Sequence, residues 1–182
     1  MPVPVAHEDV HETGPQQRAH VGGITLSRLE PLPSFTLPVS LPVTLPPRII
    51  TLDQLNGVWR INGLTYVQEA TPIVVKRGTT EVWEIRNAAR SMPHPMHVHG
   101  VQFRVLSRAG SPEQQTRVAV GEHGLAATDL GWKDTVLAWP GETVRIVTDF
   151  SHPFLGDQVY MVHCHNLEHE DGGMMLNFKI AA

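Results

Sequence analysis

The chain is poor in cysteine and in charge. Cys164 is the single cysteine among 182 residues, so no internal disulfide can form and the fold must depend on its hydrophobic core. Only 18% of the residues are charged, the formal net charge is −4, and no run of Lys and Arg is present. This composition argues against binding to nucleic acid or to an anionic membrane surface. No apolar run approaches the ~18 residues of a transmembrane helix, so we expect no membrane span.

The N-terminal region lacks the patterns of both a signal peptide and a folded domain. Its first residues, MPVPVAHEDVHE, have no basic start and no apolar segment, so we expect no signal peptide on this chain. Dense prolines between Pro31 and Pro47 favour an extended chain. We interpret residues 1–47 as a proline-rich linker, with VGGITLSRLE as the possible tail of a preceding domain, and residues 48–182 as a domain.

From Arg48 onward, short β-prone runs alternate with turn residues. The expected strands cover residues 48–52, 58–61, 71–76, 80–87, 97–108, 134–140, 142–150, 158–165 and 174–180. Several alternate apolar and polar residues, as half-buried strands do. No amphipathic helix longer than two turns is expected, although residues 110–131 could carry a short helical piece. Many short strands without helices predict an all-β sandwich or barrel.

Two histidine-rich motifs hold six of the 11 histidines and the cysteine. The first is HPMHVHG at residues 94–100, and the second is HCH at residues 163–165, followed by His169 and Met174. Because side chains alternate along a strand, His163 and His165 should point to one face and Cys164 to the other.

The cysteine side has the donors of a mononuclear copper site. A thiolate, two imidazoles and a weak axial thioether suit copper that cycles between two oxidation states, and His94 would supply the second imidazole. Zinc is the weaker alternative because it usually takes four strong ligands. A cysteine nucleophile is weaker still, since the flanking histidines point away from the thiol. Taken singly, each residue has a structural explanation, such as a buried cysteine acting as a small hydrophobe, but the combination favours copper.

The opposite face offers four imidazoles without a carboxylate or thiolate, which suits further copper ions. These belong to His97, His99, His163 and His165, and an irregularity at a strand end could splay the first two. The segment 163–165 would join the two sites through a short covalent path. The remaining histidines, His7, His11, His20, His123 and His152, are expected to bind no metal.

The motifs HPMHVHGVQFRVL, GWKDTV and YMVHCHNLEHEDGGMML resemble the final domain of bacterial three-domain multicopper oxidases. The cuprous oxidase, spore-coat laccase and bilirubin oxidase types share this pattern, and the resemblance covers roughly residues 28–182. It implies a cupredoxin-like Greek-key β-sandwich. It also implies a periplasmic or extracellular location.

The resemblance also implies roles for individual residues. His94, Cys164, His169 and Met174 match the type 1 copper ligands, His97 matches a type 2 ligand, and His99, His163 and His165 match type 3 ligands. Glu170 matches an acidic residue implicated in proton delivery to oxygen, with a solvated loop charge as the alternative. Asp134 is expected near the substrate side, or else in a structural hydrogen bond. A methionine as axial ligand implies a low or middling potential.

Only half of the family's trinuclear copper cluster is present. The family uses eight histidines from four motifs, and this chain supplies four from two. We therefore expect a complete type 1 site, half-ligated type 2 and type 3 coppers, and no oxygen reduction by the isolated chain. Its expected partners are N-terminal cupredoxin domains of the same enzyme or of a separate subunit.

We expect this chain to be one part of a copper oxidase. Its type 1 copper would take electrons from a phenol, a pigment or Cu(I), and the complete cluster would reduce O2 to water. The absence of a methionine-rich insertion before the first histidine motif favours organic reductants. A stand-alone electron-transfer cupredoxin is the main alternative, but it leaves four histidines unexplained. A copper-storage module is a third hypothesis.

Overall fold

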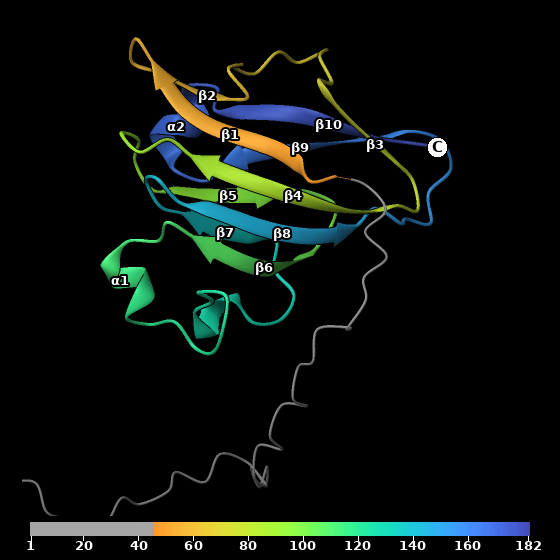
Figure 1. The fold of residues 1–182 in the computed structure, drawn as a ribbon. Coiled ribbons are helices and arrows are strands. Elements are labelled where there is room, and N and C mark those ends of the chain that lie inside the picture. The colour runs from red at the N-terminus through yellow and green to blue at the C-terminus, as the bar shows by residue number, and fades with distance from the viewer. Residues whose placement is uncertain (1–45) are drawn as a thin grey trace, which may run out of the picture. The chain divides into compact units, whose positions relative to one another are not determined.

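Ten β-strands form two five-stranded sheets in residues 46–182, the part of the chain that this computed structural model describes (Figure 1). The first sheet has the order β2 (Val58–Ile61), β1 (Arg48–Leu55), β4 (Thr80–Asn87), β8 (Thr143–Asp149), β6 (Phe103–Ala109). The second has the order β3 (Ile73–Lys76), β10 (Met175–Ala181), β9 (Gln158–Cys164), β5 (His94–Val98), β7 (Thr135–Ala138). The predicted all-β sandwich is confirmed.

Alternating apolar residues from both sheets make the core, as the sequence pattern predicts. In β8, Val144 and Ile146 are fully buried, while Arg145 between them is only partly buried. Trp83 of β4 joins the layers, because its ring lies 5.7 Å from that of Phe178 in β10, edge to face. Burial of such large apolar side chains, with no disulfide available, is what holds the two sheets together.

The run 97–108, expected as one strand, is two strands in different sheets. β5 begins earlier, at His94, and ends at Val98, whereas β6 begins at Phe103 in the other sheet. Gly100 lies in the turn between them with φ of 74°, a backbone conformation that favours glycine. An added Cβ at this position would lie 2.4 Å from the ring of Tyr160. This turn leaves His99 just beyond the strand.

Helices are short. The loop expected to carry a helical piece has two, α1 (Glu113–Thr116) and the 3-10 turn η1 (Ala127–Asp129). The segment between the expected strands 158–165 and 174–180, for which no helix was predicted, forms α2 (Leu167–Asp171), which ends at Gly172. Within residues 46–182, no helix has the length and apolar character needed to cross a membrane. The VGGITLSRLE segment lies outside the described residues, so the proposed boundary near residue 47 stays a prediction.

A buried ion network fixes the long loop 110–131 against the sandwich. Arg108 of β6 donates from Nε and Nη2 to the two carboxylate oxygens of Asp129, at 2.8 Å each, and from Nη1 to Glu142 Oε2 at 2.9 Å. The three side chains are between 0% and 4% exposed. Glu142 also accepts the backbone N–H of Trp139 at 2.9 Å. The two carboxylates therefore depend on one guanidinium for compensation of their buried charge.

Removal of that guanidinium should be costly. We expect Arg108→Ala to lower the free energy of unfolding by about 3–5 kcal/mol, because two buried carboxylates lose their counter-charge. Urea unfolding of the metal-free chain measures this. The control is Arg117→Ala, which breaks an exposed i,i+4 pair with Glu113 and should change the same quantity by less than about 0.5 kcal/mol. Equal effects of the two substitutions would contradict the role of the network.

Candidate metal centres

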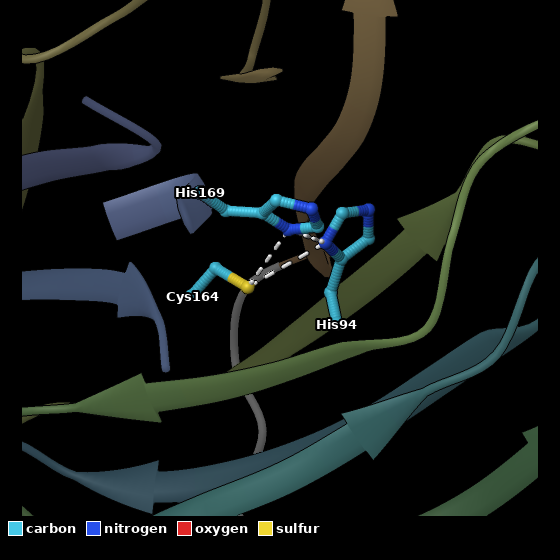
Figure 2. Close-up of side chains that lie close together, drawn as sticks. All are labelled: His94, Cys164 and His169. Atoms are coloured by element: carbon cyan, nitrogen blue, oxygen red, sulfur yellow. Dashed lines mark hydrogen bonds between the residues drawn. The ribbon is translucent and has the colours of Figure 1, made fainter. Parts of the chain in front are cut away.

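Three side chains that could hold a metal ion converge from separate elements (Figure 2). His94 comes from β5, Cys164 from the end of β9 and His169 from α2. The Cys164 Sγ lies 3.5 Å from Nδ1 of each histidine, and the two Nδ1 atoms are 3.1 Å apart. The three residues are between 0% and 3% exposed. One thiol and two imidazole nitrogens thus form a small buried triangle.

The dimensions of this triangle fit a metal ion. A point equidistant from the three atoms would lie about 2.0 Å from each, close to usual metal–nitrogen bond lengths. A trigonal set of two histidines and one cysteine is the donor arrangement of blue-copper sites, whereas a structural zinc site would require a fourth strong ligand. The donor set therefore fits copper better than zinc.

Strand pairing brings these residues together. β5 and β9 are antiparallel neighbours in which Met96 pairs with Cys164. Paired residues point to the same face, and His94, two residues before Met96, shares that face. Met174 follows α2 and is fully buried. Its carbonyl accepts the N–H of Cys164 at 3.1 Å, and its N–H donates to the carbonyl of His169 at 2.8 Å.

Contacts around the triangle direct the Nδ1 atoms inward. Ser91 Oγ lies 2.8 Å from His94 Nε2, and the Asn166 side-chain nitrogen lies 3.5 Å from His169 Nε2. Asn166 also donates its backbone N–H to the Cys164 sulfur at 3.4 Å. Such outer contacts orient metal ligands and tune the bound ion. Sequence reasoning missed these residues, because a serine and an asparagine in loops give no distinctive signal.

The second group of histidines lies on the other face of β9. The Nε2 atoms of His99 and His163 are 3.0 Å apart, and the rings of His163 and His165 are 4.7 Å apart between centroids. The ring of His97 lies 4.7 Å from that of His99 and 5.0 Å from that of His165. The predicted alternation is confirmed: Cys164 points to one side and its two neighbours to the other. We call these four residues the imidazole cluster.

His97 is oriented by β7, the strand next to β5 in the sheet, and by Asp134, the residue just before β7. Its Nδ1 lies 2.9 Å from the Asp134 carbonyl oxygen and 2.9 Å from Thr135 Oγ1. A hydrogen on Nδ1 would therefore have acceptors, which leaves Nε2 available to a metal. This places Asp134 beside the imidazole cluster, where it acts as a hydrogen-bond acceptor, rather than beside the thiol. Asp134, His97 and His99 line an open hollow of about 360 Å³.

Glu170 lies next to the imidazole cluster. Its Oε2 is 3.6 Å from Nδ1 of His163, and the side chain is 36% exposed. This carboxylate therefore touches both solvent and the outer nitrogen of a cluster histidine. The described histidines outside the two groups are His123, which is largely exposed, and His152, which stacks on Phe154 at 6.1 Å. The expectations for His7, His11 and His20 lie outside the described residues.

Burial disfavours the charged forms of four site histidines and of the cysteine thiol. Burial, aided by the neighbouring charge of His169, lowers the pKa of His94 to about 4. Burial also lowers the pKa values of His169, His99 and His163. Burial raises the pKa of the Cys164 thiol to about 11. The imidazoles of these four histidines therefore present free lone pairs at neutral pH, while a metal ion must displace the proton of the thiol.

The buried histidines give the metal-free chain an acid-sensitive fold. His94 binds a proton near pH 6.5 when unfolded but only near pH 4 when folded, so its contribution to stability is present above pH 6.5 and is lost as the pH falls toward 4. We expect the free energy of unfolding to decrease over this interval. Urea unfolding at several pH values measures it, and His94→Leu should weaken the pH dependence. An unchanged dependence in that variant would contradict the assignment.

Comparisons with known proteins agree with this geometry. The chain is 39% identical over 145 residues to bilirubin oxidase of Albifimbria verrucaria, which covers 79% of this chain and 23% of the relative. It is 43% identical over 106 residues to a laccase of Bacillus subtilis, covering 55% of this chain and 20% of the laccase. The chain thus spans about a quarter or less of the length of these relatives.

Solved structures show the same fold. The McoA multicopper oxidase of Aquifex aeolicus is 39% identical with a TM-score of 0.66, and the match covers 82% of this chain and 32% of that protein. The two sheets are thus those of a cupredoxin-like sandwich. The sequence model of the multicopper oxidase family matches residues 40–182, which include every strand and both histidine motifs described above. The chain belongs to the multicopper oxidase family, whose metal is copper.

Proposed function

We propose that this chain is the electron-accepting part of a multicopper oxidase and supplies half of its oxygen-reducing copper cluster. The observation that carries the proposal is the arrangement of three consecutive residues at the end of β9. The buried thiol of Cys164 points to one face, and the imidazoles of His163 and His165 point to the other. This arrangement joins a mononuclear site to a multi-imidazole site by the shortest covalent route that a protein chain offers.

In this proposal, His94, Cys164 and His169 hold a type 1 copper. Support comes from the triangle of donor atoms and from the exclusion of water by burial. Met174 is the proposed axial ligand, because its backbone is bonded to both Cys164 and His169 and its side chain is fully buried. Copper bound there would supply a one-electron acceptor, and the thiolate and imidazoles would balance the preferences of its two oxidation states.

The imidazole cluster is proposed to supply half of a trinuclear copper centre. His97 would be a type 2 ligand, and His99, His163 and His165 would be type 3 ligands. The close approach of His99 and His163 supports a shared metal ion for that pair. The remaining ligands would come from N-terminal cupredoxin domains of the same enzyme or of a separate subunit. The match spans only 23% of bilirubin oxidase and 32% of McoA, which is consistent with a cluster whose other ligands lie in further domains.

Residues of this chain would also guide electrons and protons. Cys164 would pass electrons through the backbone to its two histidine neighbours. Glu170 would deliver a proton toward the cluster, since its carboxylate reaches solvent and lies near His163 Nδ1. Hydrogen bonds donated by His97 Nδ1–H to the Asp134 carbonyl oxygen and to Thr135 Oγ1 would hold His97 in one tautomer.

The reductant is proposed to be an organic compound, such as a phenol or a pigment, rather than Cu(I), and the final acceptor is O2, which is reduced to water. The name of one relative, bilirubin oxidase, supports an organic reductant. The absence of a methionine-rich insertion before His94 points the same way. A periplasmic or extracellular location is part of the proposal and follows from the resemblance alone.

A stand-alone electron carrier is the alternative that also uses a type 1 copper. It accounts for the buried triangle but gives no role to four imidazoles gathered on the other side of β9. The imidazole cluster is therefore the feature that favours an oxidase over a carrier.

Copper loading of the whole chain tests the proposal. We expect an intense visible absorption band from thiolate-to-copper charge transfer, together with a type 1 spin-resonance signal. Both should disappear in Cys164→Ser and persist in His123→Ala, the control at an exposed histidine. Absence of the band in the wild-type chain would refute the type 1 assignment.

Complementation distinguishes an oxidase from a carrier. We expect no oxygen uptake with a phenolic reductant by the loaded chain alone, and uptake after addition of the two N-terminal cupredoxin domains of a homologous oxidase. In the complemented enzyme, Glu170→Gln should slow oxygen uptake and leave the visible band unchanged. A blue chain that never gains oxygen uptake, with domains shown to associate with it, would favour the carrier.

A further inference from the structure

Trp59 reaches the thiol site from the opposite sheet. It belongs to β2, the edge strand of the first sheet, whereas His94 and Cys164 lie in strands of the second. The Trp59 ring lies 4.2 Å from the ring of His169, with the planes inclined by 36°, and 5.2 Å from that of His94 at 73°. One partly buried side chain thus contacts both imidazoles of the triangle.

The position of Trp59 follows from the pairing of its strand. Trp59 pairs with Gln54 of β1, and Ile61, two residues further on, is fully buried. Residues two apart in a strand share a face, so Trp59 points toward the interior between the sheets. The antiparallel pairing of β1 and β2 therefore fixes where the indole lies relative to the thiol site.

The two imidazoles differ in how they are held. Ser91 Oγ lies 2.8 Å from Nε2 of His94, which is a good hydrogen-bond distance. The corresponding contact of His169, to the Asn166 side chain, is 3.5 Å and therefore weak. His169 also lies in a helix of only five residues. The Trp59 ring is the closest described ring contact of His169, since the His94 ring is 4.9 Å away, and it packs against the imidazole at a tilt of 36°.

We propose that Trp59 is a positioning residue for the thiolate copper site: it holds the His169 ring with Nδ1 directed at the metal and keeps water from that imidazole. This inference rests on the proposed type 1 copper. The hydrophobicity of the surroundings of such a site sets its reduction potential, because a dry environment disfavours the more highly charged oxidised state. Loss of the indole should therefore lower the potential and change the geometry of the copper.

The test uses the whole copper-loaded chain in four variants. Trp59→Ala removes the ring and opens the site, Trp59→Leu removes the ring but stays apolar, and Trp59→Phe keeps an aromatic ring. Trp132→Ala is the control, since Trp132 is 57% exposed. Each protein is measured by visible absorption, spin resonance and redox titration, and folding of each metal-free protein is checked by circular dichroism.

We expect Trp59→Ala to lower the potential and to alter the copper hyperfine splitting. Trp59→Leu should alter the splitting, with a smaller shift in potential, whereas Trp59→Phe should restore values close to those of the wild type. Trp132→Ala should change nothing. Copper binding should also quench the tryptophan fluorescence of the wild-type chain more than that of Trp59→Phe, because the indole lies next to the metal position.

Two failures are distinguishable. A wild-type chain without the thiolate-to-copper band would refute the proposed function and this inference with it. A blue wild-type chain with Trp59→Ala and Trp59→Leu variants of unchanged potential and spin-resonance spectrum would refute the inference alone. If Trp59→Ala fails to fold, the Leu and Phe variants decide by the same criteria, since a role in packing alone would change stability but not these spectra.

Discussion

The alternation of side chains along the end of β9 is the constraint on which the candidate site depends. It forces Cys164 to one face and His163 and His165 to the other, so that one strand serves two groups of donor atoms. The register with β5 then supplies histidines to both faces. His94 lies on the same face as the thiol, and His97 pairs with His163 across the strands and shares its face. A shift of this register by one residue would exchange the faces and separate every donor from its partners.

Burial and protonation are matched to metal binding at the thiol site. The three donor atoms lie within 3.5 Å of one another, and two strands and a short helix hold them at that spacing. Burial disfavours imidazolium, and the histidines are therefore ready to coordinate. The thiol is the one donor of the three that must give up a proton. Rigid strands hold two of the ligands, whereas a short helix holds the third, which explains why His169 depends on neighbours such as Trp59.

The features predicted correctly from the sequence are those that depend on periodicity and on short motifs. Strand alternation was sufficient to separate Cys164 from its flanking histidines and to predict the sandwich. It could not predict that the chain changes sheets between Val98 and Phe103, because alternation alone does not show which strands pair. The helix after Cys164 escaped prediction because five residues give too little periodicity. Trp59 was placed only by the structure, which also shows that His97 is the hydrogen-bond partner of the Asp134 carbonyl, because both contacts depend on which strands lie side by side.

The imidazole cluster differs from the thiol site in being open. Two of its histidines, His97 and His99, line an open hollow, which agrees with the proposal that another domain completes this site. The proposed oxidase requires copper at the thiol site, because this site would supply the electrons that the cluster uses. X-ray absorption spectroscopy of the chain with one equivalent of copper tests this requirement most directly. We expect one sulfur and two nitrogen neighbours, the latter at about 2.0 Å; a copper ion surrounded only by nitrogen and oxygen would contradict copper binding by Cys164.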